Sequence, residues 1–137
     1  NLSAHKRGWD DRWEEFSNWA EKGKNYHSAL LNCVDEDTSA FNQVMNAFNL
    51  PKNTDKEIKV RNNEIQQATK NAIEVPLKIM GLAYDSMEVL KAMAEIGNPN
   101  SVSDAGVGAL CARTAVEGAY LNVKIKRTFY MELKFAI

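Results

Sequence analysis

The chain has few cysteines, no long apolar run and almost no net charge, and each shortage argues against a class of protein. Its two cysteines, Cys33 and Cys111, lack the close spacing of a metal-binding pair, so we expect reduced core thiols of a cytosolic protein. No apolar stretch approaches the ~20 residues of a membrane-spanning helix, and no secretory signal opens the sequence. With a formal charge of −1, neither a nucleic acid nor an anionic membrane is an expected partner.

Common catalytic and cofactor motifs are also missing from the sequence. There is no Cys-x-x-Cys, no His-Glu-x-x-His and no Walker loop. Gly106 and Gly108 stand at the start of an expected helix with no strand before them, so they do not form a dinucleotide fingerprint. Neither His5 nor His27 has a partner at metal-ligand spacing, and neither is placed to activate a serine. We therefore expect no metal, nicotinamide or nucleotide cofactor.

Glycine and proline are scarce, and between them the apolar residues recur at helical spacing. The pattern becomes helical at Trp9, and breaks are expected at Gly23, at residues 50–51 and at residues 97–99. A chain of 137 residues is long enough for one domain that buries roughly 68% of its unfolded surface. We predict an all-α protein, an antiparallel bundle of long helices. These helices are expected near residues 25–49, 55–96 and 104–125.

The expected second long helix carries two local signals. Thr54 and Glu57 have the spacing of a capping box, which predicts the start of the helix. Pro76 lies in its middle and has no backbone N–H, so the carbonyl of Ala72 loses its helical donor. We expect a kink there. The kink is either a purely structural feature of the helix or part of the wall of a ligand groove.

One carboxylate interrupts an apolar face of the preceding helix. The apolar positions of that face are Leu30, Val34, Phe41, Val44 and Phe48. Asp37 occupies the missing place in this series, whereas Asp35 and Glu36 point toward solvent. Burying an unpaired charge among apolar side chains costs roughly several kcal/mol of folding free energy. Asp37 must therefore be paired, protonated or functional.

The helix that starts near Asp104 has a face of small residues with a polar group at each end. That face consists of Asp104, Gly108, Ala112, Ala115, Ala119 and Asn122. It suits either close packing of another helix or the approach of a flat ligand. Ser101, Ser103 and Asp104 offer side-chain oxygens to the free N–H groups of the first turn. Asp104 is therefore either a helix cap or a second functional carboxylate.

Several blocks of sequence, in order, resemble the formimidoyltetrahydrofolate cyclodeaminase family. They are Val-Asp-Glu-Asp-Thr-Ser-Ala-Phe at 34–41, Ala-Thr-Lys at 68–70 with Val-Pro-Leu at 75–77, Gly-Asn-Pro-Asn-Ser-Val-Ser-Asp-Ala-Gly-Val-Gly-Ala-Leu at 97–110, and Gly-Ala-Tyr-Leu-Asn-Val at 118–123. The resemblance predicts a partial cyclodeaminase-like domain over residues 1–125 and a divergent tail over residues 126–137. Lys126 replaces an asparagine of the family, and the Gly-Gly-Gly-Ser segment is absent, so we expect a fragment of a longer protein.

The resemblance implies a reaction without a cofactor. The anilino nitrogen of 5-formimidoyltetrahydrofolate attacks the formimidoyl carbon, and ammonia leaves to give 5,10-methenyltetrahydrofolate. Asp37, the second aspartate of the family's Val-Asp-x-Asp motif, is the implied catalytic acid–base. Asn100, Ser103, Asp104 and Asn122 are the expected substrate-binding residues.

The resemblance also implies partners, and two other functions stay open. Expected partners are a folate with or without a polyglutamate tail, further copies in a dimer or larger oligomer, and an upstream formimidoyltransferase domain of histidine breakdown. One alternative is a methenyltetrahydrofolate cyclohydrolase, which would use water as the nucleophile. The other is a non-catalytic helical dimerisation module or an inactive fragment.

Overall fold

The structure is a computed structural model that describes residues 10–135 as three long helices. A 3-10 turn at Asp10–Arg12 leads into α1 (Trp13–Phe48), which is followed by α2 (Asp55–Ile96). A second 3-10 turn, Pro99–Ser101, leads into α3 (Val102–Phe135). No strand occurs among the described residues, which confirms the predicted all-α class.

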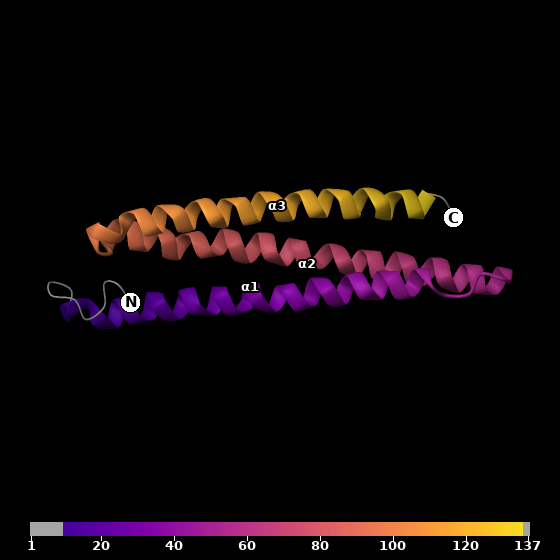
Figure 1. Cartoon of the computed structure of the whole chain (residues 1–137), viewed down its shortest axis with the longest axis horizontal. Helices are drawn as coiled ribbons and strands as arrows, with labels where there is room; N and C mark the ends of the chain where they lie inside the picture. The colour runs from indigo at the N-terminus through magenta and orange to yellow at the C-terminus, as the bar shows by residue number, and fades with distance from the viewer. Residues whose placement is uncertain (1–9, 136–137) are drawn as a thin grey trace.

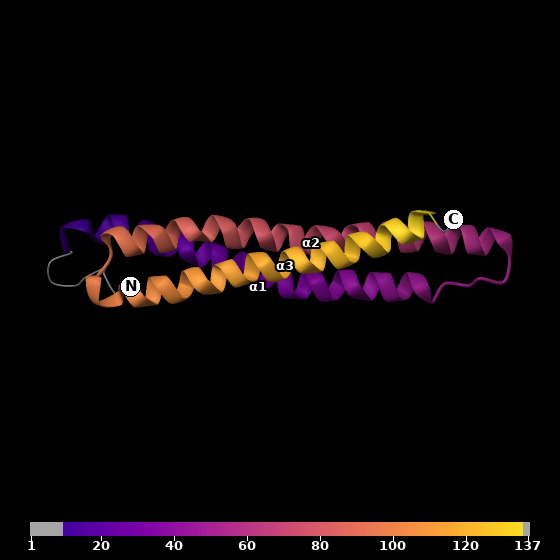
Figure 2. The ribbon, with the colours of Figure 1, turned by 90° about the horizontal axis from the view of Figure 1, so that it is seen from above.

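Helix α2 is the centre of the molecule, and α1 and α3 each pack along it (Figure 1). The chain runs up one helix and down the next, so α1 and α3 point the same way and α2 runs antiparallel to both. In the view turned by 90°, α3 crosses diagonally in front of α1 and α2 (Figure 2). The predicted antiparallel long-helix bundle is confirmed.

The break expected at Gly23 is wrong, because α1 continues through this residue. A glycine inside a helix costs only about 1 kcal/mol relative to alanine, which tertiary packing easily offsets. Gly23 faces α2, where an added Cβ would lie 3.5 Å from Cγ1 of Val89. The expected helix over residues 25–49 is therefore the second part of α1, and Trp9 lies outside the described residues.

Both ends of α2 follow the sequence signals. The hydroxyl of Thr54 accepts from the N–H of Glu57 at 3.3 Å, and the Glu57 carboxylate accepts from the N–H of Thr54 at 3.1 Å, which completes the capping box. At the other end, a Cβ on Gly97 would overlap the carbonyl oxygen of Met93. The same carbonyl accepts from the N–H of Gly97, so the chain turns here at a position that requires glycine.

Helix α3 extends ten residues beyond the expected end at Ile125 and reaches Phe135. The reason is local, since residues 119–135 contain neither glycine nor proline. The small face of α3 packs on α2: an added Cβ on Gly108 would lie only 2.6 Å from Cδ2 of Leu90, and Ala119 is buried. Close helix packing therefore accounts for these small residues.

The core contains few large side chains, since most of its buried apolar residues are alanines. One cluster joins Ala47, Ile65 and Ala68 and is covered by the partly buried Val44, Phe48 and Leu133. Many larger apolar side chains stay exposed. On α3 these include Val107, Leu110, Leu121 and Ile125, with exposed fractions of 58–70%. No helix over the described residues is long and apolar enough to cross a membrane.

Candidate functional site

A groove of about 480 Å³ lies between α1 and α3, over the middle of α2. Its walls combine apolar surface with a few polar side chains. The lining residues are Leu30, Cys33, Val34, Asp37 and Thr38 of α1, Pro76 and Ile79 of α2, and Ala115, Ala119 and Asn122 of α3. Binding sites for small molecules have volumes of roughly 300–1,000 Å³, so the size of the groove is suitable.

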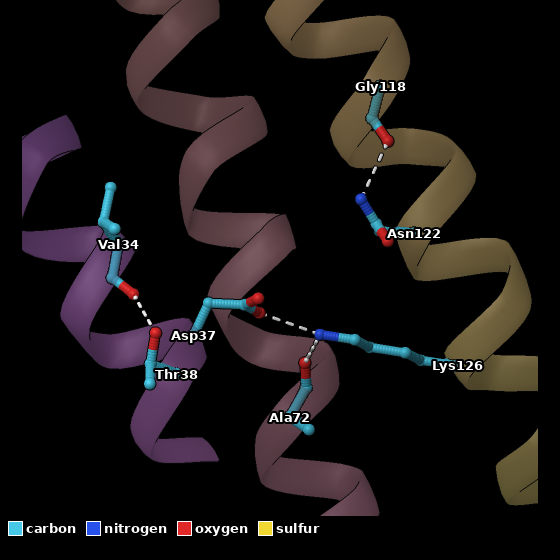
Figure 3. A network of polar contacts seen from close by, with 7 residues as sticks. All are labelled: Val34, Asp37, Thr38, Ala72, Gly118, Asn122 and Lys126. Carbon is cyan, nitrogen blue, oxygen red and sulfur yellow. Dashed lines mark hydrogen bonds and ion pairs between the residues drawn. The ribbon is translucent and has the colours of Figure 1, made fainter. Parts of the chain in front are cut away.

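Asp37 is held at the groove by a lysine from the third helix. The Nζ of Lys126 donates to Oδ1 of Asp37 at 2.9 Å and to the carbonyl oxygen of Ala72 at 3.1 Å. Figure 3 shows the Lys126 side chain reaching from α3 across α2 to meet Asp37 of α1. One ammonium thus joins all three helices at the position of the predicted catalytic residue.

The second of these bonds has its origin in Pro76. Residue 76 of a regular helix would donate its N–H to the carbonyl of residue 72, and proline has no N–H to give. Lys126 supplies that missing donor. The sequence predicts the unsatisfied carbonyl of Ala72, and the structure identifies the group that satisfies it.

The apolar environment expected around Asp37 is only partly present. Its side chain is 50% exposed, and its neighbours on the expected stripe, Val34 and Phe41, are 63% and 59% exposed. The buried line of α1 passes instead through Cys33 and Ala40, with Asp37 at its edge. Of the three outcomes open to this carboxylate, pairing is the one that the structure shows.

Asn122 is the predicted substrate-binding residue that shares the groove with Asp37. It lies one helical turn before Lys126 on α3, so the two side chains are on the same face. Its amide nitrogen donates to the carbonyl of Gly118 at 3.3 Å (Figure 3). Asp37 and Asn122 are therefore polar residues of the groove wall, and Lys126 joins them through its hydrogen bond to Asp37.

The other predicted substrate-binding residues lie at the far end of the molecule. Eighteen positions separate Asp104 from Asn122, which is about 27 Å along a helix at 1.5 Å per residue. Asp104 lines a separate cavity of about 270 Å³, while Ser103 is exposed in the same first turn of α3. Asn100 is in the preceding turn, and its N–H donates to the side chain of Asn98. Within one chain these residues do not meet Asp37.

The remaining polar side chains near the groove have structural partners. Lys78 pairs with Glu36 at 2.7 Å, which links α2 to α1 and raises the pKa of the lysine. Burial raises the pKa of the Cys33 thiol. This thiol is fully buried and stays protonated at neutral pH, so it is not an activated nucleophile.

Lys126 is the site residue that the sequence did not reveal, because it follows the last block of family resemblance. Two signals point to it. The carbonyl of Ala72 needs a donor, and Lys126 lies four residues after Asn122 on the same helical face. Neither signal gives the register of α3 on α2, which decides that the two groups meet.

The sequence of the chain is similar to those of several known proteins. The family model described as Formiminotransferase-cyclodeaminase matches residues 1–135. The methenyltetrahydrofolate cyclohydrolase of Methylorubrum extorquens is 35% identical over 125 residues, which is 91% of this chain and 60% of that protein. The formimidoyltransferase-cyclodeaminases of Rattus norvegicus and Gallus gallus are 37% and 39% identical over 103 and 106 residues. These matches span 73% and 77% of the chain, and 19% and 20% of the two relatives.

Proposed function

Because this chain belongs to the formiminotransferase-cyclodeaminase family, we propose that it forms part of a formimidoyltetrahydrofolate cyclodeaminase. The proposed reaction converts 5-formimidoyltetrahydrofolate to 5,10-methenyltetrahydrofolate with release of ammonia. The chain spans about 60% of the cyclohydrolase relative and about a fifth of the two bifunctional relatives. The activity therefore belongs to the whole protein that contains this segment.

The reaction needs little more than proton transfer. The attacking nitrogen and the formimidoyl carbon belong to one molecule, so the substrate itself provides most of the proximity. One proton must leave the attacking nitrogen, and the departing amine must be protonated before it can leave as ammonia. Side chains can do both, and this proposal includes no metal, nicotinamide or nucleotide.

The observation that carries the proposal is the position of Asp37. Its carboxylate lies on the wall of a groove large enough for a ligand and faces a cation. A carboxylate in this position can accept a proton from the attacking nitrogen. In this proposal Asn122, on the opposite wall, would hold a polar edge of the pterin.

A cyclohydrolase is the second candidate function. The Methylorubrum extorquens relative matches 91% of this chain and bears that name. The same groove would then bind 5,10-methenyltetrahydrofolate, and Asp37 would accept a proton from water instead of from the substrate nitrogen. The two reactions differ in the nucleophile and share the need for a proton acceptor.

The test uses the full-length protein that contains this segment. We expect it to release ammonia from 5-formimidoyltetrahydrofolate and to hydrolyse 5,10-methenyltetrahydrofolate much more slowly. The reverse order of rates would identify the cyclohydrolase. Absence of both reactions, together with retained self-association, would favour a helical dimerisation module and end the enzyme proposal.

We further propose a setting that follows from the cyclodeaminase reaction. The substrate would be a folate, with or without a polyglutamate tail, and the enzyme would act in the cytoplasm in the breakdown of histidine. A formimidoyltransferase domain, as named in the Rattus norvegicus relative, would supply the substrate. Fractionation of cells and assay of the transferase reaction on the same polypeptide test these points.

A further inference from the structure

The Asp37–Lys126 pair presents two proton-transfer groups of opposite kind at one groove. The carboxylate of Asp37 accepts a hydrogen bond, and the ammonium of Lys126 donates it over 2.9 Å. Asp37 is half-exposed on the groove wall, whereas Lys126 is 25% exposed. In this arrangement one group is ready to take a proton and the other is ready to give one.

The ammonium of Lys126 also has an N–H group beyond the two that bond Asp37 and Ala72. An ammonium has three N–H groups. Two of them are used by Asp37 and by the carbonyl of Ala72, and no third hydrogen bond of this ammonium is seen in the described part of the chain. The two fixed bonds orient the ammonium, so the third N–H is available to a bound molecule.

We propose that Lys126 is the general acid of this site and Asp37 the general base; the inference rests on the proposed function. Asp37 takes the proton from the attacking nitrogen as the new carbon–nitrogen bond forms. The formimidoyl group enters protonated, as amidines are at neutral pH, so the attack leaves an –NH2 group on the tetrahedral carbon. Lys126 gives a proton to this amine, and its carbon–nitrogen bond breaks as a folate nitrogen donates its lone pair, which releases ammonia and leaves the 5,10-methenyl cation. The proton on Asp37 then passes to the neutral amine of Lys126 across their hydrogen bond. Both groups return to their starting state, and no external reactant is consumed.

This division of roles follows from the charges of the two groups. In this pair Lys126 is the hydrogen-bond donor and Asp37 the acceptor, so the ammonium is the member that carries a proton toward the departing amine at the start of the reaction. An amine leaving group needs an acid, and an ammonium is suited to protonating another amine because their proton affinities are similar. The same pair serves the alternative hydrolysis, in which the substrate nitrogen released by water attack takes the lysine proton.

The decisive variant is Lys126→Arg in the full-length protein. Arginine keeps the positive charge and can bond Asp37, but its guanidinium does not give up its proton at accessible pH. We expect unchanged unfolding midpoints and a KM within about threefold of wild type, with kcat lowered by about 100-fold or more. A residue that only tethers α3 to α1 would keep its role as arginine, so kcat would survive.

A second variant tests proton donation directly. Lys126→Ala removes the acid, and added methylammonium or ethylammonium should restore a fraction of kcat that depends on the acidity of the amine. The matched control is Lys78, which makes the Glu36 ion pair between α2 and α1 at 2.7 Å. Lys78→Arg and Lys78→Ala should keep the wild-type kcat and show no response to added amines.

The results separate this inference from the proposed function. Loss of kcat in Lys126→Arg together with rescue of Lys126→Ala by amines supports the acid role. An active wild-type enzyme whose Lys126→Arg variant keeps kcat, or whose Lys126→Ala variant does not respond to amines, overturns the acid role and leaves the proposed function standing. A wild-type protein without either folate activity overturns both.

Discussion

The ammonium of Lys126 lies 3.1 Å from the carbonyl oxygen of Ala72 and donates a hydrogen bond to it. Pro76 withholds the helical N–H that this oxygen would otherwise accept. A proline inside α2 therefore creates an acceptor on its surface, and α3 carries the donor that satisfies it. The consequence is a fixed register between α2 and α3 at the level of Asp37.

This relationship predicts thermodynamic coupling between two distant positions. Lys126→Met should destabilise the protein, because it leaves the Ala72 carbonyl without a donor. In a Pro76→Ala background the helix supplies its own N–H, so the same lysine substitution should cost less by about 0.5–1.5 kcal/mol. Urea unfolding of the four proteins measures the coupling. Equal costs in both backgrounds would show that the carbonyl does not need the lysine.

Gly97 should tolerate no side chain. Alanine there would place a Cβ against the carbonyl oxygen of Met93, which is backbone and cannot move aside without deforming the end of α2. We expect Gly97→Ala to lower the free energy of unfolding by about 1–3 kcal/mol. The control is Gly106→Ala, since a Cβ on Gly106 meets no atom within 4 Å. That variant lies inside α3 and should gain up to about 1 kcal/mol. Thermal melts that rank the two variants in the opposite order would contradict the geometry.

Tyr26 should ionise unusually late among the four tyrosines. Its hydroxyl donates to Glu88 at 2.6 Å, and this bond raises the pKa of Tyr26 to about 12. The folded pKa is above the ordinary value of 10.0, so the stabilising contribution is present below pH 10 and is lost as pH rises through about 12. Absorbance at 295 nm should show a late phenolate component that disappears in Tyr26→Phe. Tyr84→Phe is the control and should keep it; a late component that survives in Tyr26→Phe would refute the assignment.

Glu88 should show the opposite pH dependence. Lys22 and Tyr26 both donate to its carboxylate and lower the pKa of Glu88. The stabilising contribution is therefore present above its ordinary pKa of 4.5 and is lost as pH falls through the lowered value. As pH is lowered, the free energy of unfolding should fall less steeply in Glu88→Gln than in wild type. An unchanged acid profile in this variant would argue against the contact.

The two ends of α2 were predictable from sequence because their causes are local. Thr54 with Glu57, and Gly97 before Pro99, act through atoms within a few residues of themselves. The continuity through Gly23 was not predictable, since the packing that offsets the glycine comes from Val89 on another helix.

The candidate site shows the same division between local and distant causes. Asp37 was identified by its place in a periodic pattern, but the pattern did not fix which face of α1 is buried. Its partner Lys126 depends on how α3 is aligned along α2. That alignment is set by contacts such as Gly108 against Leu90, which join residues far apart in the sequence.

Self-association is expected from the exposed apolar side of α3. The small face that first suggested close packing is used inside the chain, against α2. Val107, Leu110, Leu121 and Ile125 remain 58–70% exposed, more apolar surface than one helix of a stable monomer usually shows. Leu121→Lys with Ile125→Lys should shift sedimentation toward monomer at micromolar concentration. Thr128→Lys, which adds charge without removing apolar surface, is the control. A wild-type protein that sediments as a stable monomer would contradict the prediction.

The most direct test of the central claim is the rate of ammonia release by Asp37→Asn in the full-length protein. Asparagine has nearly the same shape as aspartate and still accepts a hydrogen bond from Lys126, but it cannot take up the proton. We predict nearly unchanged folding and folate binding, with ammonia release lowered by about 100-fold or more. Asp35→Asn, on the exposed neighbouring face, should have a mild effect. Full cyclisation activity in Asp37→Asn would show that Asp37 has a structural role alone.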